Sequence, residues 1–145
     1  MRIAVAADER TGVAEAVVEE LRSRGHEPAL HGALTNGEPA AWAWASEAVA
    51  REVAAGQADQ GVVCCWTGTG AAMAATKVAG VRAALCADAE TARGARRWND
   101  ANVLAISLRS TSAAVMCEIL DGWFDGAPSD EHDDVANLRH VDEIS

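Results

Sequence analysis

Five apolar runs of strand length recur along this chain, with helix-length segments between them. The runs cover Ile3–Ala7, Ala29–His31, Gly61–Cys65, Arg82–Ala87 and Val103–Ser107. Nearly continuous apolar strands that alternate with helices are typical of a parallel sheet covered on both faces. The pattern therefore predicts an α/β fold: a three-layer sandwich with a five-stranded parallel sheet in the doubly wound, Rossmann-like arrangement.

Helices are expected in the intervening segments, and glycines mark several of their ends. The expected helices cover Val13–Arg24, Pro39–Ala55, Thr69–Val78, Ala89–Trp98 and Thr111–Phe124. Gly25, Gly56 and Gly80 each stand where a helix should stop, because glycine adopts the left-handed conformation of a helix end without strain. Ligands of such a fold bind beyond the C-terminal ends of the strands, where Asp8 and Cys65 fall.

The length of 145 residues fits one domain, 1–145, that is long enough to bury a core. A shift in composition begins at Gly126, where a polar segment containing Pro128 runs to Asp134. This segment is expected to lead into a short helix over Val135–Ile144 that lies on a partner. Residues 127–145 are therefore predicted to form a C-terminal helical arm.

Composition excludes several classes of partner. The formal net charge is −10, whereas nucleic acid and anionic membranes both require a basic face. No run reaches the roughly 18 apolar residues of a membrane span, and the N-terminal run meets Asp8 before a signal peptide could form. The four cysteines have neither CxxC nor zinc spacing. This predicts reduced thiols, no metal or cofactor, and a cytoplasmic location.

One segment carries a chemical signal. Residues 64–77 read CCWTGTGAAMAATK and pass from an apolar strand through a Gly/Thr loop into an Ala-rich helix. The first amides of a helix lack intrahelical partners, so the loop from Trp66 to Gly70 is able to bind an oxyanion or phosphate. Cys65 stands at the lip of this loop. Helix N-termini lower thiol pKa values, so Cys65 is placed to act as a base or nucleophile.

Three further segments accompany this loop. They are MRIAVAAD, which ends at Asp8, then AATKVAGVRAALC, and then RRWNDANVLAISLR. In order and spacing, the segments resemble the aldose-ketose isomerases of the ribose-5-phosphate isomerase B family, which includes the galactose-6-phosphate isomerase subunits. The resemblance covers about residues 2–125. It implies a metal-independent isomerase that moves a proton between adjacent carbons through an enediol.

The resemblance implies that Cys65 is the catalytic base. Family members with a glutamate base carry it just after the glycine loop, and Ala71 occupies that place here. The alternative is that Cys65 is a buried structural thiol. The other cysteines, Cys64, Cys86 and Cys117, are expected to pack as small apolar side chains.

Further site residues follow from the same resemblance. Thr67 matches the hydroxyl donor beside the transferred proton, and the amides of Gly68, Thr69 and Gly70 would line the enediolate. The alternative for this loop is an ordinary strand-to-helix turn. Asp8 matches the carboxylate that holds sugar hydroxyls, and the alternative for Asp8 is a helix cap.

Asn99 matches a residue that reaches the active site of the neighbouring subunit, which implies a homodimer or homotetramer with composite sites. Arg109 keeps the family's arginine and is the first candidate for binding phosphate, with Arg10 and Arg139 as substitutes. One of the family's tail arginines falls at His140 here. For each isolated arginine the alternative is a solvated surface charge.

The departures from the family pattern concern the pocket. The phosphate-holding histidine is Glu9 here, the ring-opening histidine is Trp98, and the glycine after the cysteine is Trp66, which narrows the pocket mouth. Without ring opening, the expected substrate is linear. It is a tetrose or tetrulose 4-phosphate, in which phosphate on O4 prevents furanose closure, or another acyclic hydroxy-carbonyl compound. The alternative class is a non-catalytic sugar-phosphate binding protein or an inactive partner subunit of a heteromeric isomerase.

Overall fold

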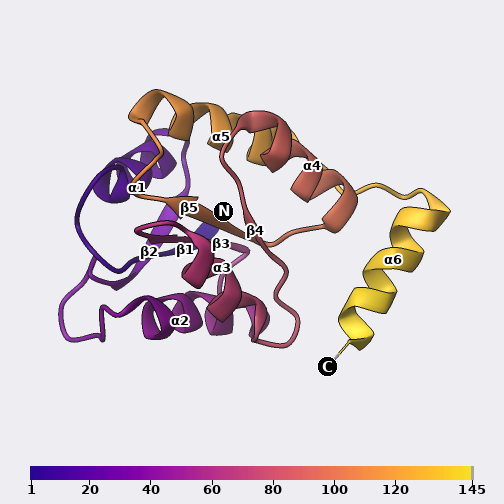
Figure 1. The fold of residues 1–145 in the computed structure, drawn as a ribbon, viewed down its shortest axis with the longest axis horizontal. Helices are drawn as coiled ribbons and strands as arrows, with labels where there is room; N and C mark the ends of the chain where they lie inside the picture. The colour runs from indigo at the N-terminus through magenta and orange to yellow at the C-terminus, as the bar shows by residue number, and fades with distance from the viewer. Residues whose placement is uncertain (145) are drawn as a thin grey trace.

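The computed structural model describes residues 1–144, in which a parallel sheet lies between two helical layers (Figure 1). The strands are β1 Arg2–Ala7, β2 Glu27–Gly32, β3 Gln60–Cys65, β4 Ala83–Leu85 and β5 Val103–Ser107. The helices are α1 Ala14–Ser23, α2 Trp42–Ala54, α3 Thr69–Thr76, α4 Ala89–Asn99, α5 Ala113–Asp125 and α6 His132–Glu143.

The sheet has five strands in the order β2-β1-β3-β5-β4, and every pair is parallel. The predicted three-layer α/β sandwich is therefore confirmed. The chain leaves β1 toward β2 on one side and continues from β3 on the other side. The strand order thus reverses between β1 and β3, which is where ligands of doubly wound folds bind.

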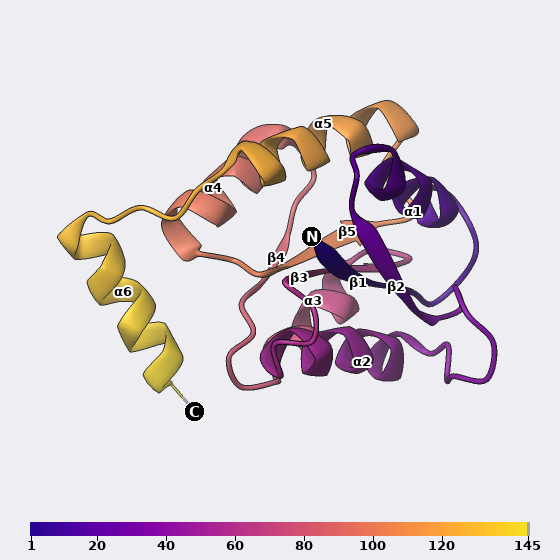
Figure 2. The same ribbon diagram turned by 180° about the vertical axis from the view of Figure 1, so that it is seen from behind.

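Alternating side chains of each strand fill separate cores on the two faces of the sheet. Ile3 and Val5 pack with α1, α4 and α5, whereas Ala4 and Ala6 pack with α2 and α3. Figure 2 shows the same two layers from behind. Cys64 belongs to the first core and Cys65 to the second, as expected for neighbours on a strand, whose side chains point to opposite faces.

Several predicted helix ends shift in the structure. Helix α2 begins at Trp42, three residues later than expected, because Ala41 just before it is extended (φ −53°, ψ 139°). Helix α3 ends at Thr76, so Gly80 (φ 87°) lies in the following turn and does not itself stop the helix. Gly25 (φ 84°) and Gly56 (φ 73°) do adopt the left-handed conformation just after their helices, as predicted.

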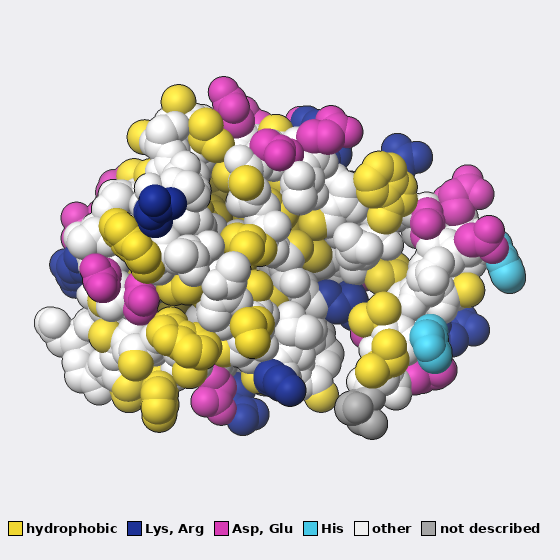
Figure 3. Space-filling model, viewed as in Figure 1, with side chains coloured by type: hydrophobic (Ala, Val, Ile, Leu, Met, Phe, Trp, Pro, Cys, Tyr) yellow, Lys and Arg dark blue, Asp and Glu magenta, His cyan; other side chains and the backbone are white. Residues whose placement is uncertain are grey.

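Helix α6 forms the C-terminal arm and begins three residues earlier than expected, at His132. None of its residues is buried, and Val141 is 49% exposed. An ion pair between Arg82 and Asp142 (3.0 Å) ties the helix to the start of β4. Figure 3 shows a hollow between this helix and the rest of the protein. Ser145, at the end of the predicted arm, lies outside the described residues.

Candidate active site

The C-terminal edge of the sheet brings together residues from three strands. Asp8 follows β1, Cys65 ends β3, and Arg109 lies two residues beyond β5. Backbone hydrogen bonds hold these ends in line: the amide of Asp8 donates to the carbonyl of Cys64 (3.2 Å), and that of Leu108 donates to the carbonyl of Cys65 (2.9 Å). The predicted carboxylate, thiol and arginine therefore share one edge.

The loop after β3 turns sharply at Gly68, whose φ is 79°. A Cβ on this residue would lie 2.5 Å from Leu85 Cδ1 and 3.0 Å from the Ser107 amide nitrogen, so both the conformation and the space require glycine. Among residues 1–144, none accepts a hydrogen bond from the four amides of Thr67 to Gly70. The loop therefore presents consecutive free donors at the start of α3.

Side chains border this row of amides. The hydroxyls of Thr67 and Thr69 lie 2.9 Å apart and form a hydrogen bond. Trp66 is 52% exposed at the mouth of the loop. Trp42, the first residue of α2, lies against Gly70, where a Cβ would come within 2.9 Å of its ring. Two indoles and two hydroxyls thus surround the amides.

The three cysteines around the sheet differ in position. Burial raises the pKa of Cys64 to about 12 and that of Cys86 to about 12, so both remain neutral thiols near pH 7. Cys65 is also buried, but it lies two residues before the first free amide and packs in the core that contains Ala71 of α3. Among these three thiols, Cys65 is the one placed for chemistry at the loop.

The carboxyl group of Asp8 has an oxygen that is available to accept hydrogen bonds. Its Oδ1 is buried and has no hydrogen-bond partner within residues 1–144. Burial, and secondly the charge of the exposed neighbour Glu9, raise the pKa of Asp8, while the Asp8 backbone amide opposes this shift. A buried carboxylate oxygen without a hydrogen-bond partner costs free energy of folding. A sugar hydroxyl that donates to this oxygen would remove that cost, so Asp8 is well suited to bind one.

The two arginines proposed for this edge behave differently. Arg10 is already engaged: its Nε donates to the Ala33 carbonyl (2.7 Å), and its Nη1 lies 3.3 Å from Glu15. Arg109 is exposed, and its side chain forms no ion pair with any residue in the range 1–144. Its guanidinium is therefore the freer of the two for an anionic ligand.

Four predicted site residues lie at the opposite edge of the sheet. Helix α4 starts at the C-terminal edge and runs back, so that Trp98 and Asn99 precede the beginning of β5. Arg139 and His140 belong to α6, which stands beside the far end of α4 in both ribbon views (Figures 1 and 2). A single chain does not bring these four residues to Cys65.

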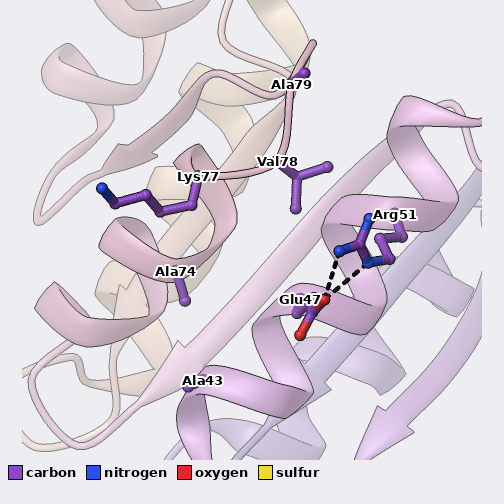
Figure 4. A pocket seen from close by; sticks show the side chains of 7 residues that line it. All are labelled: Ala43, Glu47, Arg51, Ala74, Lys77, Val78 and Ala79. Carbon is purple, nitrogen blue, oxygen red and sulfur yellow. Dashed lines mark hydrogen bonds and ion pairs between the residues drawn. The ribbon is translucent and has the colours of Figure 1, made fainter. Parts of the chain in front are cut away.

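A pocket of about 410 Å³ lies between α2 and α3 (Figure 4). Its lining consists of Ala43, Glu47, Arg51, Ala74, Lys77, Val78 and Ala79. Glu47 and Arg51 pair across one helical turn (2.7 Å), and the ammonium of Lys77 points away from them in Figure 4. The lining includes none of the sheet-edge residues described above, so this pocket is separate from the candidate site.

Residues 1–144 contain neither a metal-binding cluster nor a membrane-spanning helix. No group of three or more His, Cys, Asp or Glu side chains is arranged to hold a metal ion. No helix in the same range is long and apolar enough to cross a bilayer.

Known proteins are similar to this chain in both sequence and fold. Residues 3–144 match the sequence model of the ribose/galactose isomerase family. The chain belongs to this family. Among solved structures, the type B ribose 5-phosphate isomerase of Trypanosoma brucei is 36% identical, with a TM-score of 0.87 over 98% of this chain and 97% of that chain.

Two curated relatives extend the comparison within the family. The galactose-6-phosphate isomerase subunit LacB of Clostridium acetobutylicum is 38% identical over 100 residues, which cover 68% of this chain and 57% of LacB. The D-erythrulose-4-phosphate isomerase of Pectobacterium atrosepticum is 36% identical over 77 residues, covering 53% of this chain and 51% of that protein. The match thus spans about half the length of each of these relatives.

Sequence reasoning missed two contributors to the site. Ser107 donates a hydrogen bond to the carbonyl of Trp66 (3.1 Å), and its position follows from the pairing register of β3 with β5, which no local pattern encodes. The packing of Trp42 on Gly70 was not predicted either. The only sequence signal for this contact is that position 70 is a glycine, which leaves room for an aromatic ring to pack on it.

Proposed function

We propose that this protein is an aldose-ketose isomerase that acts on a small sugar phosphate through a cis-enediol. The observation that carries the proposal is the meeting of Asp8, Cys65 and the free amides from Thr67 to Gly70 at one sheet edge. In such a reaction one group must move a carbon-bound proton, while fixed donors stabilise the developing oxyanion. Membership of the ribose/galactose isomerase family supports the same reaction class.

The proposed reaction moves protons within the substrate and needs no redox partner. The Cys65 thiolate removes the proton from the carbon beside the carbonyl, and the electron pair moves onto the carbonyl oxygen as an enediolate. The free amides stabilise that oxygen, and Thr67 passes a proton between the two substrate oxygens. Cys65 then returns its proton to the neighbouring carbon. A reduced thiol is required, which fits a cytoplasmic location.

Substrate binding is assigned to groups around this centre. Asp8 accepts hydrogen bonds from sugar hydroxyls through its unpartnered oxygen. Arg109 binds the phosphate, because a guanidinium makes paired hydrogen bonds to phosphate oxygens. Arg10, whose guanidinium already binds the Ala33 carbonyl and Glu15, is a weaker candidate than Arg109.

The active unit in this proposal is a homodimer, or a homotetramer built from such dimers. Trp98, Asn99, Arg139 and His140 lie at the edge opposite Cys65 in the same chain. A second subunit related by a two-fold axis is able to present them to the first, and closed two-fold symmetry is the commonest arrangement of soluble oligomers. The exposed α6, with no buried residue, supports a role against a partner.

The proposed substrate is a linear tetrose or tetrulose 4-phosphate. Trp98 occupies the place of the ring-opening histidine, and an indole has no proton that titrates near neutral pH. A sugar with phosphate on O4 needs no ring opening. The similarity to a D-erythrulose-4-phosphate isomerase supports this choice of substrate class.

The test is a screen of tetrose, pentose and hexose phosphates in D₂O, with solvent deuterium incorporation as the readout. Incorporation at the carbons next to the carbonyl, lost in Cys65→Ala, supports the proposal. Binding of a sugar phosphate without any deuterium exchange would instead identify a binding protein or an inactive partner subunit.

A further inference from the structure

The carbonyl of Trp66 is held from the β5 side by two donors. The Ser107 hydroxyl donates to it over 3.1 Å, and the backbone amide of Arg109 donates to it over 2.9 Å. Ser107 is the last residue of β5 and lies opposite Cys65 in the parallel register. The peptide that joins the cysteine strand to the glycine loop is therefore fixed from one side.

Ser107 is itself oriented by the turn that follows it. The amide and the hydroxyl of Ser110 both donate to the Ser107 hydroxyl oxygen, over 3.2 Å and 2.9 Å. A hydroxyl has a single proton to donate, and these two incoming bonds leave that proton for the Trp66 carbonyl. Hydrogen bonds in series polarise one another, which strengthens the bond to Trp66.

The orientation of this peptide determines where the Thr67 amide points. The residues of the described range contain no cis peptide bond, and in a trans peptide the N–H points opposite to the C=O. The Trp66 carbonyl faces β5, so the Thr67 N–H points away from β5 toward the β1 side of β3, where Asp8 follows β1. That N–H has no acceptor among residues 1–144.

We propose that Ser107 is a positioning residue of the isomerase, whose hydroxyl aims the Thr67 amide at the enediolate oxygen. The proposal rests on the proposed isomerase function and deepens it, because Ser107 acts through the Trp66–Thr67 peptide. The oxygen carries more negative charge in the enediolate than in the sugar carbonyl. A correctly aimed amide therefore lowers the barrier more than it tightens substrate binding.

Ser107→Ala removes the hydroxyl and leaves the Arg109 amide as the remaining donor to the Trp66 carbonyl. We expect kcat to fall roughly 10-fold to 100-fold, the scale of a small misplacement of a catalytic group, with little change in KM. The affinity for a hydroxamate analogue of the enediolate should fall by the same factor as kcat. In ¹⁵N spectra the Thr67 amide resonance should shift.

Two further variants separate positioning from general stability. Ser107→Thr keeps the hydroxyl and should restore both kcat and the Thr67 resonance. Ser112→Ala is the matched control: Ser112 follows the same strand and caps α5 by accepting a hydrogen bond from the Val115 amide (3.1 Å). It should lower the unfolding midpoint without changing kcat or the Thr67 resonance.

The readouts distinguish this inference from the proposed function. If the wild-type protein isomerises no sugar phosphate, the proposed function fails, whereas the Thr67 resonance in Ser107→Ala still reports on the orientation of the peptide. An unchanged Thr67 resonance, or a wild-type kcat in Ser107→Ala, overturns the inference. A loss of kcat that Ser107→Thr does not restore overturns it as well.

Discussion

Arg82 connects the two parts of the protein that face away from Cys65: its guanidinium pairs with Asp142 of α6 (3.0 Å) and with Asp100 just after α4 (3.1 Å). The Arg82 Nε also donates to the Asp100 carbonyl (3.0 Å). Asp100 has a left-handed conformation and directly follows Asn99. The arm and the end of α4, which carries Trp98 and Asn99, are thus tied into one surface.

If that surface serves a neighbouring subunit, two inactive variants should complement each other. Cys65→Ala and Asn99→Ala, mixed after partial unfolding and refolding, should recover about a quarter of wild-type activity, because half of the dimers are hybrids with one intact site. A mixture of Cys65→Ala with Thr67→Ala is the control and should stay inactive, since both residues lie on the same edge of one chain. Equal recovery in both mixtures would contradict composite sites.

Cys65→Ala should lower kcat at least about 100-fold, the usual contribution of a positioned acid or base. Cys64→Ala is the matched control. Its thiol is neutral near pH 7, because burial raises its pKa to about 12, and it faces the other core. This control should keep turnover while losing some stability. Near-normal turnover of Cys65→Ala on the true substrate would show that another group carries the proton.

Asp8 should make stability depend on pH in a defined direction. Its pKa is raised above the ordinary value of 3.8 by burial and by Glu9, so the folded state holds the proton more tightly than the unfolded state. The carboxyl group therefore favours folding at pH values below 3.8, and this advantage declines as the pH rises through the folded pKa. Asp8→Asn should be more stable than wild type at pH 7, and the difference should narrow toward pH 4.

Urea unfolding at several pH values measures this difference, and a carboxyl ¹³C titration gives the pKa of Asp8 directly. Glu9→Gln removes the neighbouring charge and should lower the midpoint of that titration. A gap between Asp8→Asn and wild type that stays constant from acidic to neutral pH would mean that the carboxyl group is not perturbed.

Trp98 leads to a prediction about substrate preference. Wild-type kcat/KM should be far higher on a tetrose 4-phosphate than on ribose 5-phosphate, because an indole cannot open a furanose ring by acid-base chemistry. Trp98→His should raise activity on ribose 5-phosphate selectively. A wild-type preference for ribose 5-phosphate would mean that ring opening proceeds without a histidine at position 98.

Sequence patterns predicted the layers of the fold because the strands are buried on both faces and read as continuous apolar runs, as in Ile3–Ala7. Helix ends were harder to place, since the Ala-rich segments around Trp42 and Thr76 have similar helix propensity inside and outside the helices. The loop from Trp66 to Gly70 was recognised because glycine spacing and strand polarity are local signals.

Other features of the site depend on contacts that span the chain. The hydrogen bond from Ser107 to Trp66 joins residues 41 positions apart. The ring of His31, near the end of β2, lies 3.0 Å from Glu38 and 3.3 Å from Glu52. Such pairs follow from the register of the sheet and the path of α2, which no single segment of sequence specifies.

The packing of Trp42 on Gly70 makes these two positions share a single volume. A Cβ at position 70 would come within 2.9 Å of the indole, so bulk can be added at one position only if it is taken from the other. The width of the entrance to the amides can therefore be redesigned by exchanging side-chain size between residues 42 and 70. Such an exchange leaves the side chains of Cys65 and Asp8 in place, and we expect it to change the length of sugar that reaches them.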